Sequence, residues 1–130
     1  MTTMANEGLT IAEAADRTGL TTHTLRYYER DGLMLAEVGR TSAGHRVYTE
    51  RDLTWLVMLT RLRATGMPIR EISAYAALCR ARDGNEDERL ALLRAHRRRV
   101  LDQLAEVTDH LGAIDNKIGL YESRTSTSPR

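Results

Sequence analysis

The 130-residue sequence predicts a mainly α-helical protein, in which four short helices and a small β wing precede one long helix. Two helix-capping signals occur within the first 21 residues, separated by only a short turn. Residues 33–48 then lose the helical period and contain several glycines. After residue 88, apolar residues recur at alternating spacings of three and four, as in a coiled coil. Together these three observations give the fold class.

The first two helices have strong start and stop signals. A capping box opens the first, with Thr10 at the N-cap and Glu13 three residues later, and Gly19 ends it. Thr21 can cap a second helix that runs to about Asp31. Two short helices joined by so short a turn have the spacing of a helix-turn-helix unit.

The middle of the sequence predicts a wing and two more helices. Residues 33–48 are interpreted as two short strands around a glycine-containing loop. Thr49 begins a third helix with apolar residues at helical spacing up to Gly66. Pro68 starts a fourth helix, which fades near Gly84.

The last segment, from about Glu88 to Tyr121, is the most regular, with Arg97 in the one gap of its apolar seam. Such a helix would extend roughly 50 Å at 1.5 Å per residue, farther than a core built from residues 9–80 could cover. We therefore expect its partner to be a second copy of the chain. The predicted dimerisation residues are Leu93, Val100, Leu104, Val107, Leu111, Ile114 and Ile118.

Composition and charge narrow the possible functions. The net charge is only +1, but residues 17–70 hold nine arginines and no lysine against five acidic residues. No long apolar stretch or signal-peptide pattern occurs, and Cys79 is the single cysteine, so we expect a cytoplasmic protein without a disulfide. No catalytic or metal-ligating constellation is evident, and neither an enzyme nor a cofactor or metal is expected.

The sequence resembles the MerR family of bacterial transcription regulators over about residues 9–121. The segments that carry the resemblance are TIAEAADRTGLTTHTLRYYERDGL, GHRVYTERDL, RLRATGMPIREI and LGAIDNKIGLYE. The resemblance implies a winged helix-turn-helix DNA-binding domain at 9–80 and a dimerisation helix at 85–121 that pairs antiparallel with its twin. We expect the termini, 1–8 and 122–130, to be flexible.

The resemblance also implies which residues meet DNA. The second helix would enter the major groove, the wing arginines would face the DNA, and the third helix would reach the phosphate backbone. Arginine suits these contacts because its planar, charged guanidinium donates to phosphates and base edges. Tyrosine adds a neutral hydroxyl donor. Which of the two adjacent tyrosines is buried stays open, as does the alternative that both belong partly to the core. The predicted DNA-binding residues are His23, Thr24, Arg26, Tyr27, Tyr28, Arg40, Arg46, Tyr48 and Arg63.

The implied function is a homodimeric regulator that binds an inverted repeat in double-stranded promoter DNA. The family resemblance implies that it distorts an over-long promoter spacer and so acts on RNA polymerase indirectly. The alternative is a coiled-coil adaptor whose winged domain holds a protein partner. No membrane partner is expected.

Cys79, near the end of the fourth helix, has two interpretations. It is either an effector-responsive thiol, assisted by Arg80 and Arg82, or a small apolar residue packed beside Leu78.

Overall fold

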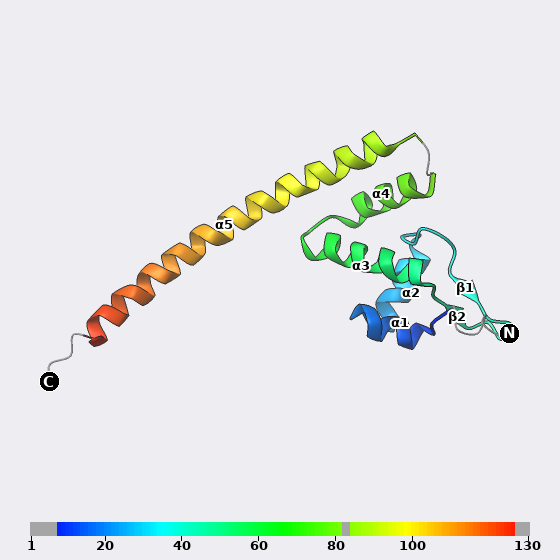
Figure 1. The fold of residues 1–130 in the computed structure, drawn as a ribbon, viewed down its shortest axis with the longest axis horizontal. Coiled ribbons are helices and arrows are strands. Elements are labelled where there is room, and N and C mark those ends of the chain that lie inside the picture. Colours follow the sequence, from blue (N-terminus) through cyan, green and yellow to red (C-terminus); the bar gives the residue numbers. More distant parts are fainter. Residues whose placement is uncertain (1–7, 82–83, 127–130) are drawn as a thin grey trace. The chain divides into compact units, whose positions relative to one another are not determined.

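The computed structural model describes residues 8–81 and 84–126. The chain divides into two compact units, Met1–Leu92 and Leu93–Arg130. Within the described residues the fold is mainly helical with one small two-stranded sheet, which confirms the predicted class (Figure 1). The elements are α1 (Ile11–Thr18), α2 (Thr22–Arg30), β1 (Gly39–Arg40), β2 (Arg46–Val47), α3 (Glu50–Ala64), α4 (Ile69–Ala81) and α5 (Glu86–Ser126).

The turn between α1 and α2 forms as its local sequence predicts. Thr10 and Glu13 make the reciprocal capping box, with bonds of 2.8 and 3.1 Å. Gly19 ends α1 at φ 76°, a left-handed conformation that glycine adopts without steric cost. The Thr21 hydroxyl then accepts a hydrogen bond from the Thr24 amide and caps α2.

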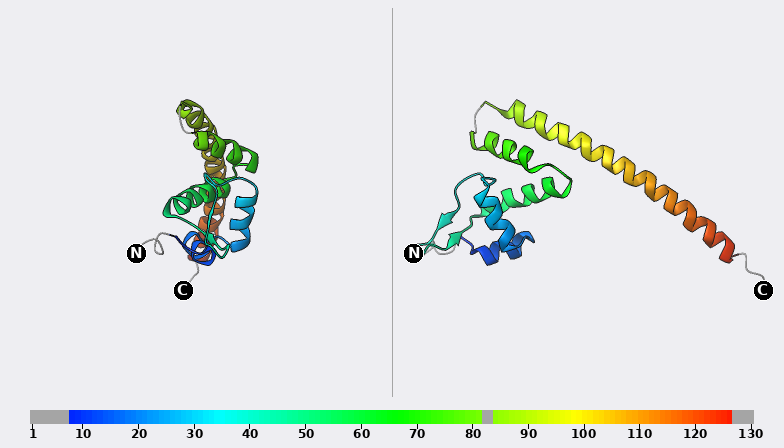
Figure 2. Two further views of the ribbon diagram at one scale, coloured as in Figure 1. Left: turned by 90° about the vertical axis from the view of Figure 1, so that its right-hand side faces the viewer. Right: turned by 180° about the vertical axis from the view of Figure 1, so that it is seen from behind.

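The wing is a minimal antiparallel hairpin. Gly39 pairs with Val47 and Arg40 with Arg46. In Figures 1 and 2 the hairpin projects from the edge of the helices of the first unit. Its base is held by a bridge between Leu9 and Tyr48, whose backbone groups exchange two hydrogen bonds of 2.8 Å. A stretch just before α1 is thus tied to the end of the wing.

Helices α3 and α4 supply much of the core of this unit. The indole Nε1 of Trp55 donates a buried 2.7 Å hydrogen bond to the carbonyl of Leu33, and its ring stacks on Tyr75. These contacts hold the segment after α2 against α3. The largest fully buried side chains are Leu25, Leu33, Tyr48, Leu56, Leu59, Met67 and Ile72.

Helix α4 begins directly after Pro68, a residue without a side-chain hydroxyl. The Pro68 carbonyl accepts from the amides of Glu71 and Ile72 at 3.0 and 3.1 Å. The Arg63 guanidinium also bonds the Met67 carbonyl at 3.0 Å. Backbone bonds and an arginine from α3 therefore organise the loop without a capping hydroxyl.

Helix α5 is longer than the sequence predicted. The dimerisation helix was expected to end at residue 121, whereas α5 continues through residues 122–126. The hydroxyls of Thr125 and Ser126 bond back to the carbonyls of Glu122 and Ser123, so the polar residues of the last turn satisfy their donors within the helix. Residues 127–130 and 1–7 lie outside the described part of the chain. At 1.5 Å per residue α5 extends about 60 Å.

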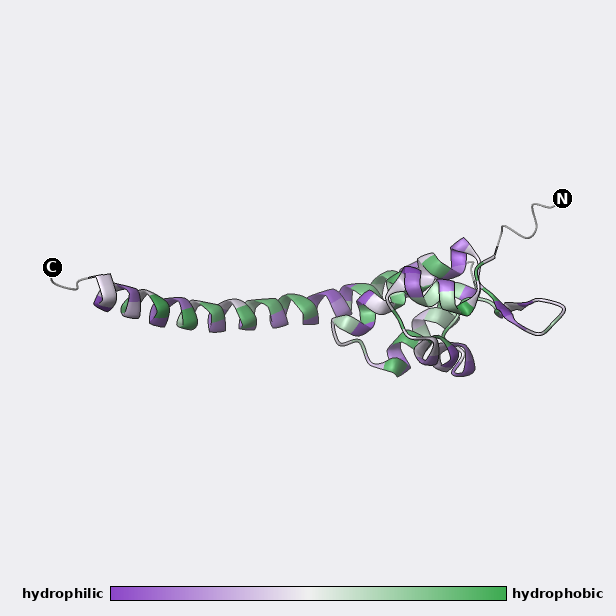
Figure 3. Ribbon diagram, turned by 90° about the horizontal axis from the view of Figure 1, so that it is seen from below, coloured by the Kyte–Doolittle hydropathy of each residue, from purple (hydrophilic) through white to green (hydrophobic). Residues whose placement is uncertain are grey.

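The apolar seam of α5 is exposed in the single chain. Leu104, Val107, Leu111 and Ile114 are each between 53% and 61% exposed. Figure 3 shows hydrophobic segments recurring turn after turn along this helix. Contiguous apolar surface of this kind is typical of an interface.

Candidate nucleic-acid interface

Helix α2 has one face in the core and one in solvent. Leu25 and Tyr28 are buried, whereas His23 and Arg26 are exposed. Thr24 is half-buried, and its hydroxyl accepts a 3.0 Å bond from the Thr21 hydroxyl. The cap thus fixes the start of the helix while the His23 and Arg26 side chains point outward.

The structure decides which of the two tyrosines is buried. Tyr28 is 6% exposed, so it is the buried tyrosine and leaves little surface for the predicted DNA contact. Burial raises the pKa of the Tyr28 hydroxyl, an effect that nearby Arg63 opposes. Tyr27 is half-buried, with the Arg30 guanidinium 5.6 Å from its ring centroid. Tyr27 is therefore the tyrosine of the pair whose side chain is partly accessible to a DNA ligand.

Both wing arginines bind one carboxylate of α2. Arg40 Nη2 lies 3.1 Å from Glu29 Oε2, and Arg46 Nε donates to Glu29 Oε1. Arg40 also donates to the Gly44 carbonyl at the turn of the wing, at 3.3 Å. The structure thus brings the predicted wing residues and α2 together, through a residue that the sequence had not singled out. The available signal was an acid between Tyr28 and Arg30 on an otherwise basic helix.

Tyr48 is not available to DNA in this structure, so its prediction as a DNA-binding residue is wrong. The residue is 1% exposed and belongs to the core, and its backbone is bridged to Leu9. Burial raises the pKa of its hydroxyl, and the carboxylate of Glu29 adds to that increase while Arg46 lowers it. Among the described residues, the Tyr48 hydroxyl is a buried polar group without a hydrogen-bond partner.

Replacing Tyr48 by phenylalanine should therefore stabilise the protein or leave it unchanged. Removing an unpaired buried hydroxyl relieves a desolvation cost of about 1–3 kcal/mol in the free energy of unfolding. Denaturant unfolding would measure the change, and DNA affinity should stay that of the wild type. A loss of affinity at unchanged stability would restore Tyr48 as a DNA contact.

Arg63 is exposed on α3, with one guanidinium nitrogen committed to the Met67 carbonyl. Its positive charge opposes the rise in the pKa of the Tyr28 hydroxyl on α2. Contact of Arg63 with phosphate stays a prediction. The bond to the Met67 carbonyl would already orient the side chain for such a contact.

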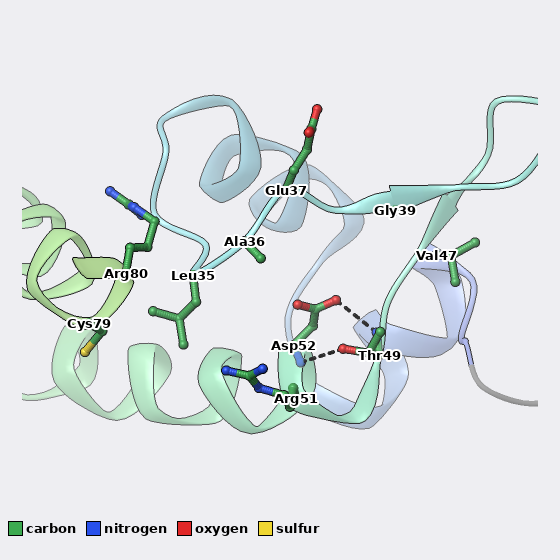
Figure 4. Close-up of a pocket in the computed structure, with 10 residues that line it drawn as sticks. All are labelled: Leu35, Ala36, Glu37, Gly39, Val47, Thr49, Arg51, Asp52, Cys79 and Arg80. Carbon is green, nitrogen blue, oxygen red and sulfur yellow. Dashed lines mark hydrogen bonds between the residues drawn. The ribbon is translucent and has the colours of Figure 1, made fainter. Parts of the chain in front are cut away.

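Cys79 is half-buried and lines a pocket of about 650 Å³ between the wing, the start of α3 and the end of α4 (Figure 4). The Arg80 guanidinium donates to the carbonyls of Gly32 and Met34 at 3.1 and 2.7 Å and so holds the segment after α2. Tyr75 neighbours the thiol, and burial together with Cys79 raises the pKa of the tyrosine. Arg82 lies outside the described residues. Effector response at Cys79 stays a prediction.

Several polar groups of this pocket already have roles in the fold. Asp52 and Thr49 make the capping box of α3, seen as the paired dashed lines in Figure 4. In the same view the Glu37 carboxylate points away from the pocket. Leu35, Ala36 and Val47 supply apolar lining. The pocket is thus an apolar hollow beside capping groups.

Residues 8–81 and 84–126 contain no group of three or more histidine, cysteine or acidic side chains placed to hold a metal ion. Nor does any helix formed by these residues have the length and apolarity that a bilayer crossing requires.

Comparison with known proteins identifies the relatives of this chain. Residues 9–78 match the family model described as MerR HTH family regulatory protein. An HTH-type transcriptional regulator of Haemophilus influenzae is 36% identical over 113 residues, covering 87% of this chain and 83% of the relative. The chain belongs to the MerR family. Its relatives are transcription regulators and not enzymes, as the sequence predicted.

Solved structures agree with this MerR assignment. HiNmlR, a MerR family regulator lacking the sensor domain and bound to promoter DNA, is 34% identical with a TM-score of 0.81, over 92% of this chain and 94% of that one. A MerR family regulator from Listeria monocytogenes is 31% identical with a TM-score of 0.82, over 88% and 86%. The arrangement of α1 to α4 and the wing is thus that of a MerR regulator.

Proposed function

We propose that this MerR regulator binds an inverted repeat in promoter DNA as a homodimer, through α2 and the wing. The observation that carries the proposal is the joining of these two elements by the ion pairs of Glu29, with Arg26 exposed on α2 and Arg40 held beside that helix. Arginine suits phosphate and base-edge recognition because its planar fork stays charged. The similarity to HiNmlR, which was crystallised on promoter DNA, supports this reading.

Dimerisation would follow from the exposed seam of α5. Leu104, Leu111 and Ile118 recur at heptad spacing and are 59%, 53% and 49% exposed. An antiparallel pairing of two copies would cover the seam and set the distance between the two winged units. Two half-sites at fixed separation are what a two-fold symmetric dimer reads.

The proposed mode of regulation is deformation of the promoter. A dimer that bends and untwists an over-long spacer would bring the two polymerase recognition elements into register, so RNA polymerase would be affected without a protein contact. DNA deformation of this size is repaid by the contacts that the bent duplex permits. The proposed location of such a regulator is the cytoplasm.

Selection of bound duplexes from random DNA tests the proposal. We expect recovery of an inverted repeat, and an affinity that falls steeply with salt because bound arginines release counterions from the phosphates. Titration at two salt concentrations by fluorescence anisotropy measures the slope. Recovery of no enriched sequence, with a flat salt dependence, would contradict the proposal and favour the protein-adaptor alternative.

A further inference from the structure

We infer that Glu29 is a positioning residue that sets DNA specificity by holding the two wing arginines against α2. The inference rests on the proposed DNA-binding function and assigns a task to a residue that would repel DNA. Its charge has the sign of the phosphates, yet it lies between the two elements proposed to bind them. Its presence there therefore calls for a structural explanation.

Glu29 binds both wing arginines at once. Each carboxylate oxygen of Glu29 is taken by a different arginine, Oε2 by Arg40 and Oε1 by Arg46. The Glu29 side chain is 19% exposed, so these ion pairs are partly shielded from water and from salt. Charge-assisted bonds of this kind are stronger and more directional than those between neutral groups.

The register of the hairpin also places the two arginines close to each other. Arg40 lies directly opposite Arg46 across the two strands, so the two side chains share a face of the wing. Like charges at directly opposite positions destabilise a strand pair. Glu29, reaching from α2, neutralises this repulsion and at the same time fixes the direction of both guanidinium groups.

The size of the wing makes this tether important. Each strand has two residues, and an isolated two-stranded hairpin is marginally stable in water. The Leu9–Tyr48 bridge holds the base of the hairpin, whereas the ion pairs hold its arginine-bearing strands. Without Glu29 the arginines would keep their charge and lose their fixed position against α2.

The two arginines then have different roles. The Arg46 side chain is 23% exposed and is mainly an anchor, whereas that of Arg40 is 43% exposed and keeps surface for a DNA contact. The family resemblance predicts that both arginines face DNA and makes no distinction between them. In the structure, one of them orients the wing that presents the other.

A charge-only account and the positioning account predict opposite results for Glu29→Gln. Removing a negative charge from a DNA-binding surface should tighten binding to every duplex if charge alone matters. If Glu29 positions the wing, affinity for the selected inverted repeat should fall while affinity for a scrambled duplex stays equal or rises. The ratio of the two affinities should drop roughly tenfold or more.

The experiment measures both affinities by fluorescence anisotropy for wild type, Glu29→Gln, Glu29→Asp and the control Glu37→Gln. Aspartate keeps the charge on a shorter arm, so the charge-only account predicts wild-type behaviour and positioning predicts a reduced ratio. Because Glu29→Asp retains the charge, it still tests the inference if Glu29→Gln fails to fold. Glu37 is an exposed acid just before the wing, and its replacement removes the same charge without touching these ion pairs, so its ratio should stay that of the wild type.

A double-mutant cycle completes the test. If Glu29 acts through the wing arginines, Glu29→Gln should lower the ratio no further when Arg40 and Arg46 are already alanine. A further loss in that background, or an unchanged ratio in Glu29→Asp, would overturn the inference. The wild type would still bind its inverted repeat in either case, whereas failure of the wild type to select any sequence would instead contradict the proposed function.

Discussion

Replacing Leu104 and Leu111 together by glutamate should convert the protein to a monomer that no longer binds its inverted repeat specifically. Each leucine occurs twice in a symmetric dimer, so four buried side chains are lost. At about 1.5–3 kcal/mol for each leucine, the loss is about 6–12 kcal/mol before the cost of burying carboxylates. This corresponds to at least about four orders of magnitude in the dimer dissociation constant. Analytical ultracentrifugation measures the assembly, and circular dichroism checks that the helices persist.

The chain offers a matched control for that pair. Ala113 and Leu120 are also seven residues apart on α5 and exposed, but they lie about 200° around the helix from Leu111 and Ile118. Glutamate at both positions adds the same charge at the same spacing and should leave the dimer intact. A wild type that sediments as a monomer, or a dimer that survives substitution of the seam leucines, would contradict pairing through this seam.

Replacing Arg26 by alanine should have the second-largest effect, on DNA recognition itself. Arg26 is exposed on the face of α2 opposite the buried Leu25 and Tyr28. If its guanidinium contacts a base edge, the loss on the inverted repeat should be about 1–3 kcal/mol, with scrambled duplexes affected little. If it contacts phosphate, affinity should fall for all duplexes and the salt slope should decrease by about one.

Arg98→Ala is the control for the arginine prediction. It removes one positive charge from an exposed position on α5, where three successive arginines point in different directions around the helix. Its affinity and salt slope should match those of the wild type. Wild-type affinity in Arg26→Ala would remove α2 from the proposed interface.

The sequence determined the elements whose signals are local. The capping boxes at Thr10 and Thr49 fix two helix starts, because each donor and acceptor lie within one turn. The heptad seam predicted α5 for the same reason, since its period depends only on neighbouring residues. The family motifs correctly predicted the MerR assignment. The helical end of α5 was missed because a polar serine- and threonine-rich segment has no periodic signal of its own.

The tertiary structure alone decided what joins these elements. Adjacent tyrosines point to different sides of a helix, and only the packing of α2 shows that Tyr28 is the buried one. Arg40 and Arg46 bind a carboxylate 11 and 17 residues earlier, a pairing that no local rule predicts. Likewise, Tyr48 is 1% exposed, and its backbone pairs with Leu9, 39 residues earlier in the chain. Local propensity fixes where helices begin and end, whereas the partners of buried and charged side chains depend on how distant segments meet.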